Sequence, residues 1–309
     1  VLKKKDIRGF IGEGMLCSSE ELGFEEESNG IIELSDDAPI GKNYADWINL
    51  SDPIFEIGLT PNRGDCASVL GIARELSAIG LGKFKYNNSP KIKGSYKSPI
   101  EWNINLNSHN KNACSYVKGR HFKGLKNVES PEWLKKCLLS IGLKPISSLV
   151  DLTNFITFDL GRPLHVFDAN KLNGNLCMRM ANQGETILAL DGKNYDLNKE
   201  VLIIADDNGP VSIAGVMGGE ESACDKNTTE IFLESAYFDP KNIAVSGRLL
   251  NILSDARYRF ERGVDPIYVD KGIDIMTKLV LEICGGEVSE EEEAGKIQLT
   301  KKVVKFDPS

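Results

Sequence analysis

The spacing of apolar positions changes repeatedly along the chain, and each spacing predicts a kind of element. Apolar residues about 3.6 positions apart, typical of a helix with one buried face, predict helices over 66–79, 131–141, 149–160, 240–250, 255–262 and 269–284. Short alternating or continuous apolar runs predict strands over 30–34, 52–60, 101–106, 115–122, 176–181, 185–190, 201–205, 211–216 and 230–235. So many short strands with Gly and Asn turns indicate a sheet-rich α+β protein.

Polar residues and proline mark where several helices begin. Asp65 follows the turn 61–64 and is expected to cap the first helix, and Ser130 is expected to cap the helix that has Pro131 in its first turn. Arg63, in the same turn, is expected to form a structural salt bridge, although a guanidinium group also binds phosphate.

The stretches between the predicted elements suggest more than one domain. Residues 1–34 indicate the remainder of a small β-barrel whose earlier part precedes Val1, and 83–101, rich in Lys, Asn, Ser, Pro and Gly, is typical of a linker. The acidic run 290–293 is expected to be a second, solvated linker. Residues 301–309 are expected to begin a further domain.

Composition narrows the class of protein. The 309 residues are 41% hydrophobic and 27% charged, which is usual for a soluble globular protein. No apolar run approaches the about 20 residues of a membrane span, and no signal core follows the first lysines, so we expect a cytoplasmic protein without membrane contact. Seven scattered cysteines without a CxxC pair argue against disulfides and structural zinc. The net charge of −8 argues against nonspecific coating of nucleic acid, although local basic faces are compatible with it.

Two ionisable residues stand in apolar surroundings. His165 follows the turn Gly161-Arg162-Pro163, whose backbone is restricted by proline, and it is flanked by Leu164 and Val166. It is either a half-buried histidine bonded to a backbone carbonyl or part of a pocket wall. Glu234 lies inside a buried strand, where a carboxylate needs a salt bridge or a ligand to compensate for burial. Both alternatives stay open for each residue.

Other stretches could close a pocket with these two residues, but none is a nucleophile motif. The glycine-rich run 214–220 exposes backbone N–H groups, and Ser254 and Ala256 place small side chains at the start of a helix. GxSxG, HExxH and P-loop patterns are absent from the sequence, and the glycines are not spaced as a dinucleotide fingerprint. The residues alone therefore indicate a pocket with backbone donors, a histidine and a buried glutamate.

Four ordered blocks carry a more specific signal, namely GMLCSSEELG (14–23), LTPNRGDCASVLGIARELS (59–77), VDLTNFITFDLGRPLHVFDANKL (150–172) and the series from GVMGGEES to FERGVDP (215–266). In order and spacing they resemble the β subunits of bacterial phenylalanyl-tRNA synthetases. The resemblance implies the C-terminal part of an oligonucleotide-binding-type barrel in 1–45, a partial small α/β domain and linker in 46–97, a sheet-rich editing domain with flanking helices in 98–290, and the start of a further domain in 291–309.

The resemblance also implies an activity and roles for residues. Editing hydrolyses the ester of tyrosine wrongly attached to tRNA(Phe), and Glu234 would accept the tyrosine hydroxyl while His165 would position the tRNA 3′ end or the attacking water. The remaining substrate-binding residues would be Lys144, Pro163, Gly215, Gly218, Ser254 and Ala256. The family often has Arg at position 144 and Thr at position 254. Lysine loses bidentate geometry there, and serine loses a methyl group.

The same resemblance implies partners and cofactors. The chain would bind tRNA(Phe) and an α subunit in an α2β2 heterotetramer, and the α subunit would carry the aminoacylation site with its ATP and magnesium. No metal or cofactor is expected in this chain itself. The alternatives are a noncatalytic scaffold that binds tRNA and the α subunit, and a free-standing protein that binds or modifies tRNA.

Overall fold

The computed structural model describes residues 4–23, 30–48, 53–85, 89–297 and 303–307, and the chain forms two units, 1–54 and 55–309. The described part of the first unit contains the antiparallel pair β1 (Lys5–Ile7) and β2 (Phe10–Gly12), a bridge between Ser18 and Ile31, and the short helix α1 (Tyr44–Trp47). The α+β class is confirmed, but these elements do not establish the predicted barrel. Residues 53–60 form no helix or strand, so the strand predicted over 52–60 is wrong for its described part.

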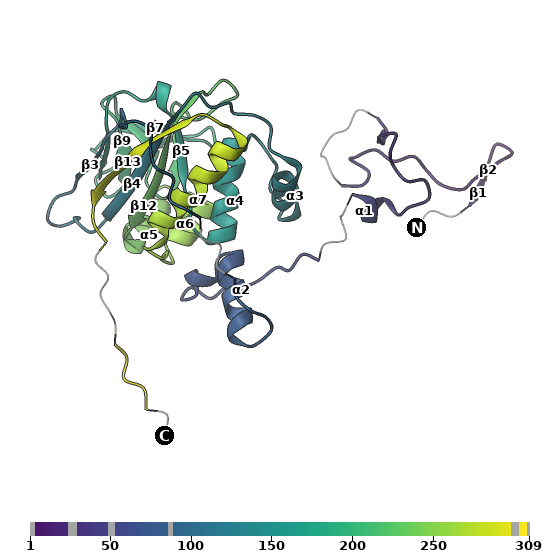
Figure 1. Ribbon diagram of the computed structural model, residues 1–309, viewed down its shortest axis with the longest axis horizontal. Helices are drawn as coiled ribbons and strands as arrows, with labels where there is room; N and C mark the ends of the chain where they lie inside the picture. Colours follow the sequence, from purple (N-terminus) through teal and green to yellow (C-terminus); the bar gives the residue numbers. More distant parts are fainter. Residues whose placement is uncertain (1–3, 24–29, 49–52, 86–88, 298–302, 308–309) are drawn as a thin grey trace. The chain divides into compact units, whose positions relative to one another are not determined.

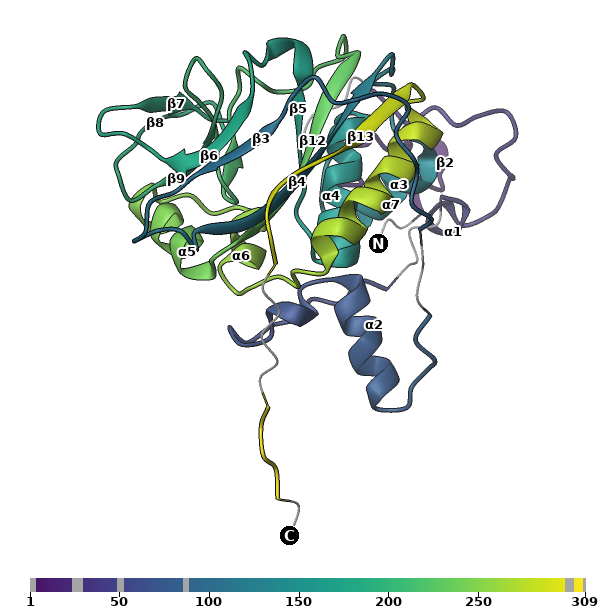
Figure 2. The same ribbon diagram turned by 60° about the vertical axis from the view of Figure 1, so that its left-hand side comes forward.

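The second unit has three layers, and its middle layer is an antiparallel sheet (Figures 1 and 2). The strand order of this sheet is β13-β4-β12-β5, with bounds Glu287–Gly295, Cys114–Lys123, Glu230–Phe238 and His165–Asp168. Both of its faces are buried, because a second sheet covers one and helices cover the other, and successive side chains of each strand point to opposite faces. On β12, Ile231 and Leu233 point to one apolar cluster, and Phe232 and Ala236 point to the other.

A five-stranded sheet covers one face of the middle layer. Its order is β11-β10-β9-β6-β3, with bounds Met217–Gly218, Pro210–Ile213, Leu202–Ala205, Leu176–Met180 and Trp102–Asn105. Neighbouring strands are antiparallel except β3 and β6. The hairpin of β7 (Thr186–Leu188) and β8 (Asn194–Asp196) lies beside it. The larger apolar cluster fills the space between the two sheets.

Helices cover the opposite face of the middle sheet, as Figure 2 shows. They are α3 (Glu132–Ser140), α4 (Ser148–Leu160) and α7 (Tyr268–Ile283), and their apolar faces form the second cluster with β4, β5 and β12. Two further helices, α5 (Pro240–Leu249) and α6 (Asp255–Phe260), follow β12 and close the end of the sheet sandwich. The predicted elements after residue 100 are thus largely confirmed.

Within the second unit, the start of helix α2 (Val69–Ala78) packs against the elements after residue 100 through small residues and one arginine. An added Cβ on Gly161 would lie 3.2 Å from the Ser68 Cβ, and Arg259 donates a hydrogen bond from Nε to the Ala67 carbonyl over 3.1 Å. Ser68 caps α2 by accepting from the Gly71 amide, so the predicted cap at Asp65 is wrong. Asp65 instead lies in the short 3-10 helix Gly64–Cys66.

Ser130, which was predicted to cap α3, links α3 to α4 instead. The Ser130 hydroxyl donates to the Asp151 carboxylate of α4 over 2.5 Å, and Pro131 occupies the N-cap position of α3 without a side-chain hydrogen bond. Sequence reasoning missed this because a distant carboxylate competes for the hydroxyl. The result is a buried polar link between α3 and α4.

The acidic run 290–293 is an edge strand rather than a linker. It lies within β13, whose pairing with β4 is interrupted by a bulge between Val288 and Glu291. The Lys118 ammonium group, almost completely buried, forms ion pairs with Glu291 over 2.8 Å and with Asp270 of α7 over 2.5 Å. A buried cation on the neighbouring strand therefore compensates for the acidic side chains, and the domain boundary predicted at 290 falls inside this strand.

The stretch predicted as a linker packs along β13 in its second half. The Ser95 amide donates to the Val288 carbonyl over 2.9 Å, and the Glu290 amide donates to the Tyr96 carbonyl over 2.7 Å. An added Cβ on Gly94 would overlap the backbone of Ser289 and Glu290. This close approach requires glycine.

We expect Gly94→Ala to detach residues 89–97 from β13 and to lower the free energy of unfolding by roughly 1–3 kcal/mol, the usual cost of overpacking. The midpoint of urea unfolding and the rate of tryptic cleavage at Lys91 and Lys93 measure the two effects. Gly82→Ala is the matched control because its added Cβ would meet no atom within 4 Å. Identical behaviour of the two variants would show that the contact does not hold the segment.

Candidate functional site

Glu234 and His165 face each other across neighbouring strands. In the pairing of β12 with β5, Glu234 lies directly opposite His165, and on the other side of β12 it lies opposite Gly119 of β4. Directly opposite residues point to the same face, with Cβ atoms about 4.5–5.5 Å apart. Both side chains therefore lie on the face that meets the five-stranded sheet.

These two side chains line a small cavity between the sheets. Its volume is about 60 Å³, room for a few water molecules. The sequence-predicted residues among its walls are His165, Glu234, Pro163, Gly215, Gly218 and Ala256, and the others are Leu164, Ser212, Ile213, Val216, Met217 and Phe260. Segments from α4 to α6 along the chain thus meet at one place.

His165 is held as a neutral ring. Burial lowers the pKa of His165 to about 4, and its ring packs edge-on against Phe167 with 4.4 Å between ring centroids. The Nε2 atom is buried and has no hydrogen-bond partner within the described residues. The bond to a backbone carbonyl considered above is not found at that nitrogen, which is therefore available to a small polar ligand.

Glu234 is a buried carboxyl group without a direct partner. Its residue is 6% exposed, and the described part of the chain offers its carboxylate no hydrogen bond or ion pair. Burial raises the pKa of Glu234 to about 7, against the opposing charge of Arg162. The structural salt bridge considered for Glu234 is therefore not found, and the carboxyl group titrates near neutral pH.

Two glycines at the site, Gly218 and Gly215, allow close packing, the first against the His165 ring and the second against the apolar core. An added Cβ on Gly218 would lie 2.9 Å from His165 Nε2, so only glycine lets β11 pass this close to the ring. Gly215 has a φ of +67°, and its added Cβ would lie 2.8 Å from Ile243 in the core. Gly215 is therefore required by its turn and by core packing as well as by the cavity.

Ser254 and Lys144 do not line the cavity. The Ser254 hydroxyl caps α6 by accepting from the Arg257 amide, and it donates to the Val216 carbonyl over 2.6 Å. Ser254 thus fixes the glycine turn against the helix that carries Ala256. Lys144 is exposed in the connection between α3 and α4. Their assignment as substrate contacts stays a prediction.

Some residues of the site were not singled out from the sequence. Ser212 is buried on β10, lines the cavity and donates to the Met217 carbonyl over 3.2 Å. Phe260 and Met217 complete the wall. The signal for Ser212 was its polar hydroxyl within the apolar run 211–216, but only the packing of two sheets shows which cavity it faces.

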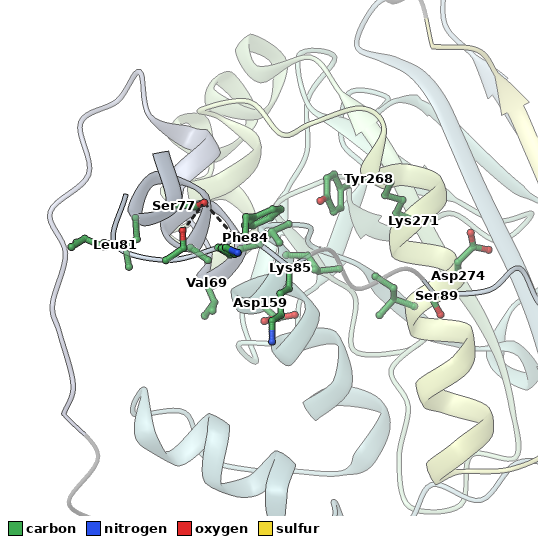
Figure 3. A pocket seen from close by; sticks show the side chains of 17 residues that line it. Val69, Ser77, Leu81, Phe84, Lys85, Ser89, Asp159, Tyr268, Lys271 and Asp274 are labelled. Carbon is green, nitrogen blue, oxygen red and sulfur yellow. Dashed lines mark hydrogen bonds between the residues drawn. The ribbon is translucent and has the colours of Figure 1, made fainter. Parts of the chain in front are cut away.

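A larger open pocket lies between α2 and the helices α4 and α7 (Figure 3). It has a volume of about 670 Å³, and its lining combines aliphatic side chains such as Val69, Leu76 and Leu81 with several lysine and aspartate side chains. Its Lys271 lies over the Tyr268 ring, 5.0 Å from the centroid. Asp159, also in its lining, has a pKa raised by burial. This pocket is wide and of mixed character, and it does not bring together the residues that the sequence analysis singled out as candidate site residues.

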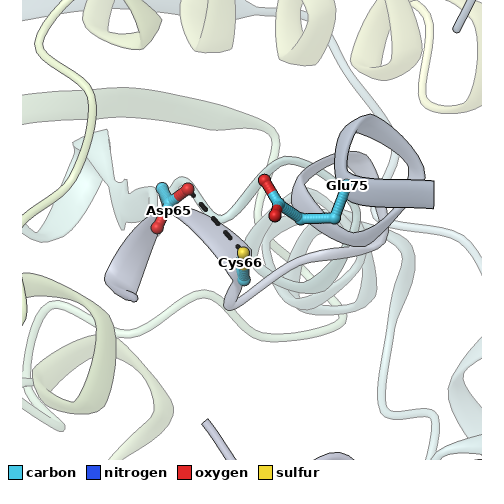
Figure 4. A group of neighbouring side chains, drawn as sticks. All are labelled: Asp65, Cys66 and Glu75. Atoms are coloured by element: carbon cyan, nitrogen blue, oxygen red, sulfur yellow. Dashed lines mark hydrogen bonds between the residues drawn. The ribbon is translucent and has the colours of Figure 1, made fainter. Parts of the chain in front are cut away.

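Asp65, Cys66 and Glu75 form the one group of possible metal ligands found among the described residues (Figure 4). One atom from each lies within 4.8 Å of the others. However, Arg63 pairs with Asp65 over 3.0 Å and with Glu75 over 2.8 Å, and Arg74 also pairs with Asp65. Burial raises the pKa of Cys66, which favours the protonated thiol. The group does not fit a divalent cation, and the salt bridge predicted for Arg63 is confirmed.

Comparison with known proteins identifies the family of the chain. The model of the B3/4 domain matches residues 113–285. The chain is 51% identical over 300 residues to the phenylalanine–tRNA ligase beta subunits of Brucella melitensis and Mesorhizobium japonicum. Both matches cover 97% of this chain and 37% of the relative. The beta subunit of Nitrobacter winogradskyi is 50% identical over 300 residues.

A solved structure with 15% sequence identity, an N-terminal fragment of the phenylalanyl-tRNA synthetase beta subunit from Pyrococcus horikoshii, matches 77% of this chain and 65% of its own at a TM-score of 0.42. Among the described residues, no helix has the length and apolar character needed to cross a membrane. The chain spans 37% of the length of the first relatives. On the family model and the sequence identity, it belongs to the family of the phenylalanine–tRNA ligase beta subunit.

Proposed function

We propose that residues 98–290 edit the product of phenylalanyl-tRNA synthesis by hydrolysing the ester of Tyr-tRNA(Phe). The observation that carries this proposal is the position of Glu234, a buried carboxyl group without a partner in the described chain, in the wall of a cavity and opposite His165. A buried carboxylate without a partner is costly. A ligand that donates a hydrogen bond to it removes part of that cost.

The carboxylate gives the site a basis for choosing tyrosine over phenylalanine. A hydrophobic synthetic pocket rejects an analogue with one added hydroxyl only weakly, so a second site that requires the hydroxyl improves accuracy. A tyrosyl hydroxyl donates to Glu234, whereas a phenylalanyl ring would leave the carboxylate unpaired. The cavity must widen to admit the ring, and Met217 is a flexible wall residue suited to such a change.

His165 fits a positioning role better than that of a strong base. With a pKa of about 4 its ring is neutral at pH 7 and takes up a proton poorly. Its unpartnered Nε2 can hold the attacking water or a hydroxyl of the tRNA 3′ end. Water then attacks the ester carbonyl, the bond to the ribose oxygen breaks, and that oxygen receives the proton.

The remaining parts of the proposal concern the whole enzyme. A cytoplasmic assembly with α subunits, written α2β2, would carry out aminoacylation with ATP and magnesium on the α subunit, while this region binds the 3′ end of tRNA(Phe). A noncatalytic scaffold is the alternative function. The unpartnered polar atoms of Glu234 and His165 favour editing, because a scaffold has no use for them.

Glu234→Ala, made in a full-length β subunit assembled with its α subunit, should slow the hydrolysis of preformed Tyr-tRNA(Phe) at least tenfold. This factor is the lower end of the effect expected when a substrate loses one hydrogen bond to a charged group. His165→Ala should also slow it. Charging of tRNA(Phe) with phenylalanine should stay nearly intact, and both rates are measured with labelled amino acid.

Glu220→Ala is the control for this test, because Glu220 is an exposed glutamate of the same glycine-rich stretch. Equal loss of hydrolysis and charging in Glu234→Ala would indicate a folding defect. Unchanged hydrolysis in both site variants would show that the ester is cleaved at another site. An absence of hydrolysis by the wild type would support the noncatalytic scaffold instead.

The preference for tyrosine should depend on pH. Because burial raises the pKa of Glu234 to about 7, the accepting carboxylate accumulates only as pH rises through that value. The ratio of Tyr-tRNA(Phe) to Phe-tRNA(Phe) hydrolysis should rise about tenfold between pH 6 and pH 8. The ratio cancels the general lability of esters to base. Glu234→Gln should give a low ratio that does not change with pH, and a wild-type ratio that is flat would contradict this role.

A further inference from the structure

Arg162 is buried directly behind the wall of the cavity. It is 0% exposed and follows Gly161, which ends α4 in a left-handed conformation. Its Nε donates to the Ser235 hydroxyl over 3.3 Å, and its Nη2 donates to the Ala236 carbonyl. Both partners follow Glu234 on β12, beyond the point where β5 stops pairing. The guanidinium group thus occupies the edge of β12 next to the site.

Two further contacts fix this side chain. Its guanidinium carbon lies 5.5 Å from the centroid of the Phe260 ring, which lines the cavity. Gly272 of α7 provides space for it, because an added Cβ there would lie 3.1 Å from Arg162 Cγ. Arg162 therefore has little freedom to turn away from the cavity.

The hydrogen bonds of Arg162 leave its charge incompletely compensated. Its Nη1 is buried and has no hydrogen-bond partner among the described residues. A buried cation requires a nearby negative charge. The acidic groups whose charge acts on Arg162 are Glu234 and Tyr237 of β12, Cys114 of β4 and Asp265 before α7. His165 of β5 faces Glu234 from the other strand and is neutral.

Only one of these acidic groups is both buried and a carboxyl. Asp265 is exposed, so water screens its charge. Burial raises the pKa of the Cys114 thiol, which is therefore uncharged at neutral pH. Glu234 remains as the buried counter-charge, and within the described part of the chain Arg162 is the cation whose charge favours the ionised form of Glu234.

We propose that Arg162 is a positioning residue of this site, whose charge favours the ionised form of Glu234 that accepts the substrate hydroxyl. The catalytic role of Arg162 rests on the proposed function. The electrostatic interaction between Arg162 and Glu234 does not depend on that function. Arg162 acts at a distance through its charge, since no direct ion pair with Glu234 is found within the described residues.

A purely structural role is the competing explanation, because Arg162 also closes the edge of β12. Stability alone cannot separate the two roles, since both predict that its loss destabilises the protein. The ionisation of Glu234 separates them. A structural arginine leaves the midpoint of that ionisation unchanged in a folded variant.

The test is an NMR titration of the 309-residue chain labelled with ¹³C at glutamate carboxyl carbons, with the Glu234 signal assigned by its loss in Glu234→Gln. Arg162→Met should raise the midpoint of the Glu234 titration by about one pH unit or more, and Arg162→Lys should restore most of it. An unchanged midpoint in folded Arg162→Met would overturn the proposal. Arg120→Met is the matched control, because Arg120 is 1% exposed and also donates to backbone carbonyls.

A measurement on the wild type covers the case in which Arg162→Met does not fold. The ¹⁵N shift of Arg162 Nε should titrate with the same midpoint as the Glu234 carboxyl carbon, and Glu234→Gln should abolish that titration. Independent behaviour of the two signals would refute the coupling.

Hydrolysis assays on the assembled enzyme then separate the two proposals. If Arg162→Met raises the midpoint in the chain, the pH profile of the tyrosine preference should shift upward by the same amount. If Arg162→Met raises the Glu234 midpoint but the assembled enzyme does not hydrolyse Tyr-tRNA(Phe), the editing function is refuted and the interaction of the two charges is not. If the enzyme hydrolyses Tyr-tRNA(Phe) but Arg162→Met leaves the pH profile of the tyrosine preference unshifted, the role of Arg162 is refuted and the editing function is not.

Discussion

The site depends on the register of β12 between its two neighbours. With Glu234 opposite His165 on one side and Gly119 on the other, three strands place a carboxyl group and an imidazole side by side on one face, beside a glycine that two aromatic rings cover. A slip of one residue would turn Glu234 toward the helical layer and Leu233 toward the other sheet. The long ladder with β4, from Glu230 to Phe238, is what prevents such a slip.

The neighbours of Glu234 are themselves fixed by packing. An added Cβ on Gly119 would lie 2.5 Å from both Phe232 and Trp102, whose rings contact each other over the glycine. A glycine inside a strand is otherwise unfavourable. Here it lets two aromatic rings cover the strand beside the carboxyl group and exclude water from that side. The low exposure of Glu234 follows from this arrangement.

Much of the architecture was accessible from the sequence, because local patterns determine it. The amphipathic spacing in 269–284 and the capped start at Asp239 predicted α7 and α5 almost to the residue. Predictions that depended on distant partners were wrong. The acidic strand β13 was read as a linker because its compensating cation, Lys118, lies 173 positions away in the sequence from Glu291.

The same limit applies to the site. The turn before His165, the carboxylate at Glu234 and the stretches that carry Gly218 and Ala256 were recognised from local sequence, and the family resemblance added the substrate-binding roles of these two residues. No local pattern could show that the Ser254 hydroxyl donates to the Val216 carbonyl and accepts from the Arg257 amide of its own helix. Nor could it show that Ser212 faces the cavity. These facts arise where sheets and helices meet.

The acidic strand β13 also bears on how the protein behaves at high concentration. It is the edge of the middle sheet, and an edge strand exposes unpaired amide and carbonyl groups that can join the sheet of another molecule. Its side chains at 290–293 are all glutamates, and the 89–97 segment lies along its first half. Two such edges repel each other, so the charges that looked like a solvated linker instead keep separate molecules from pairing into a continuous sheet.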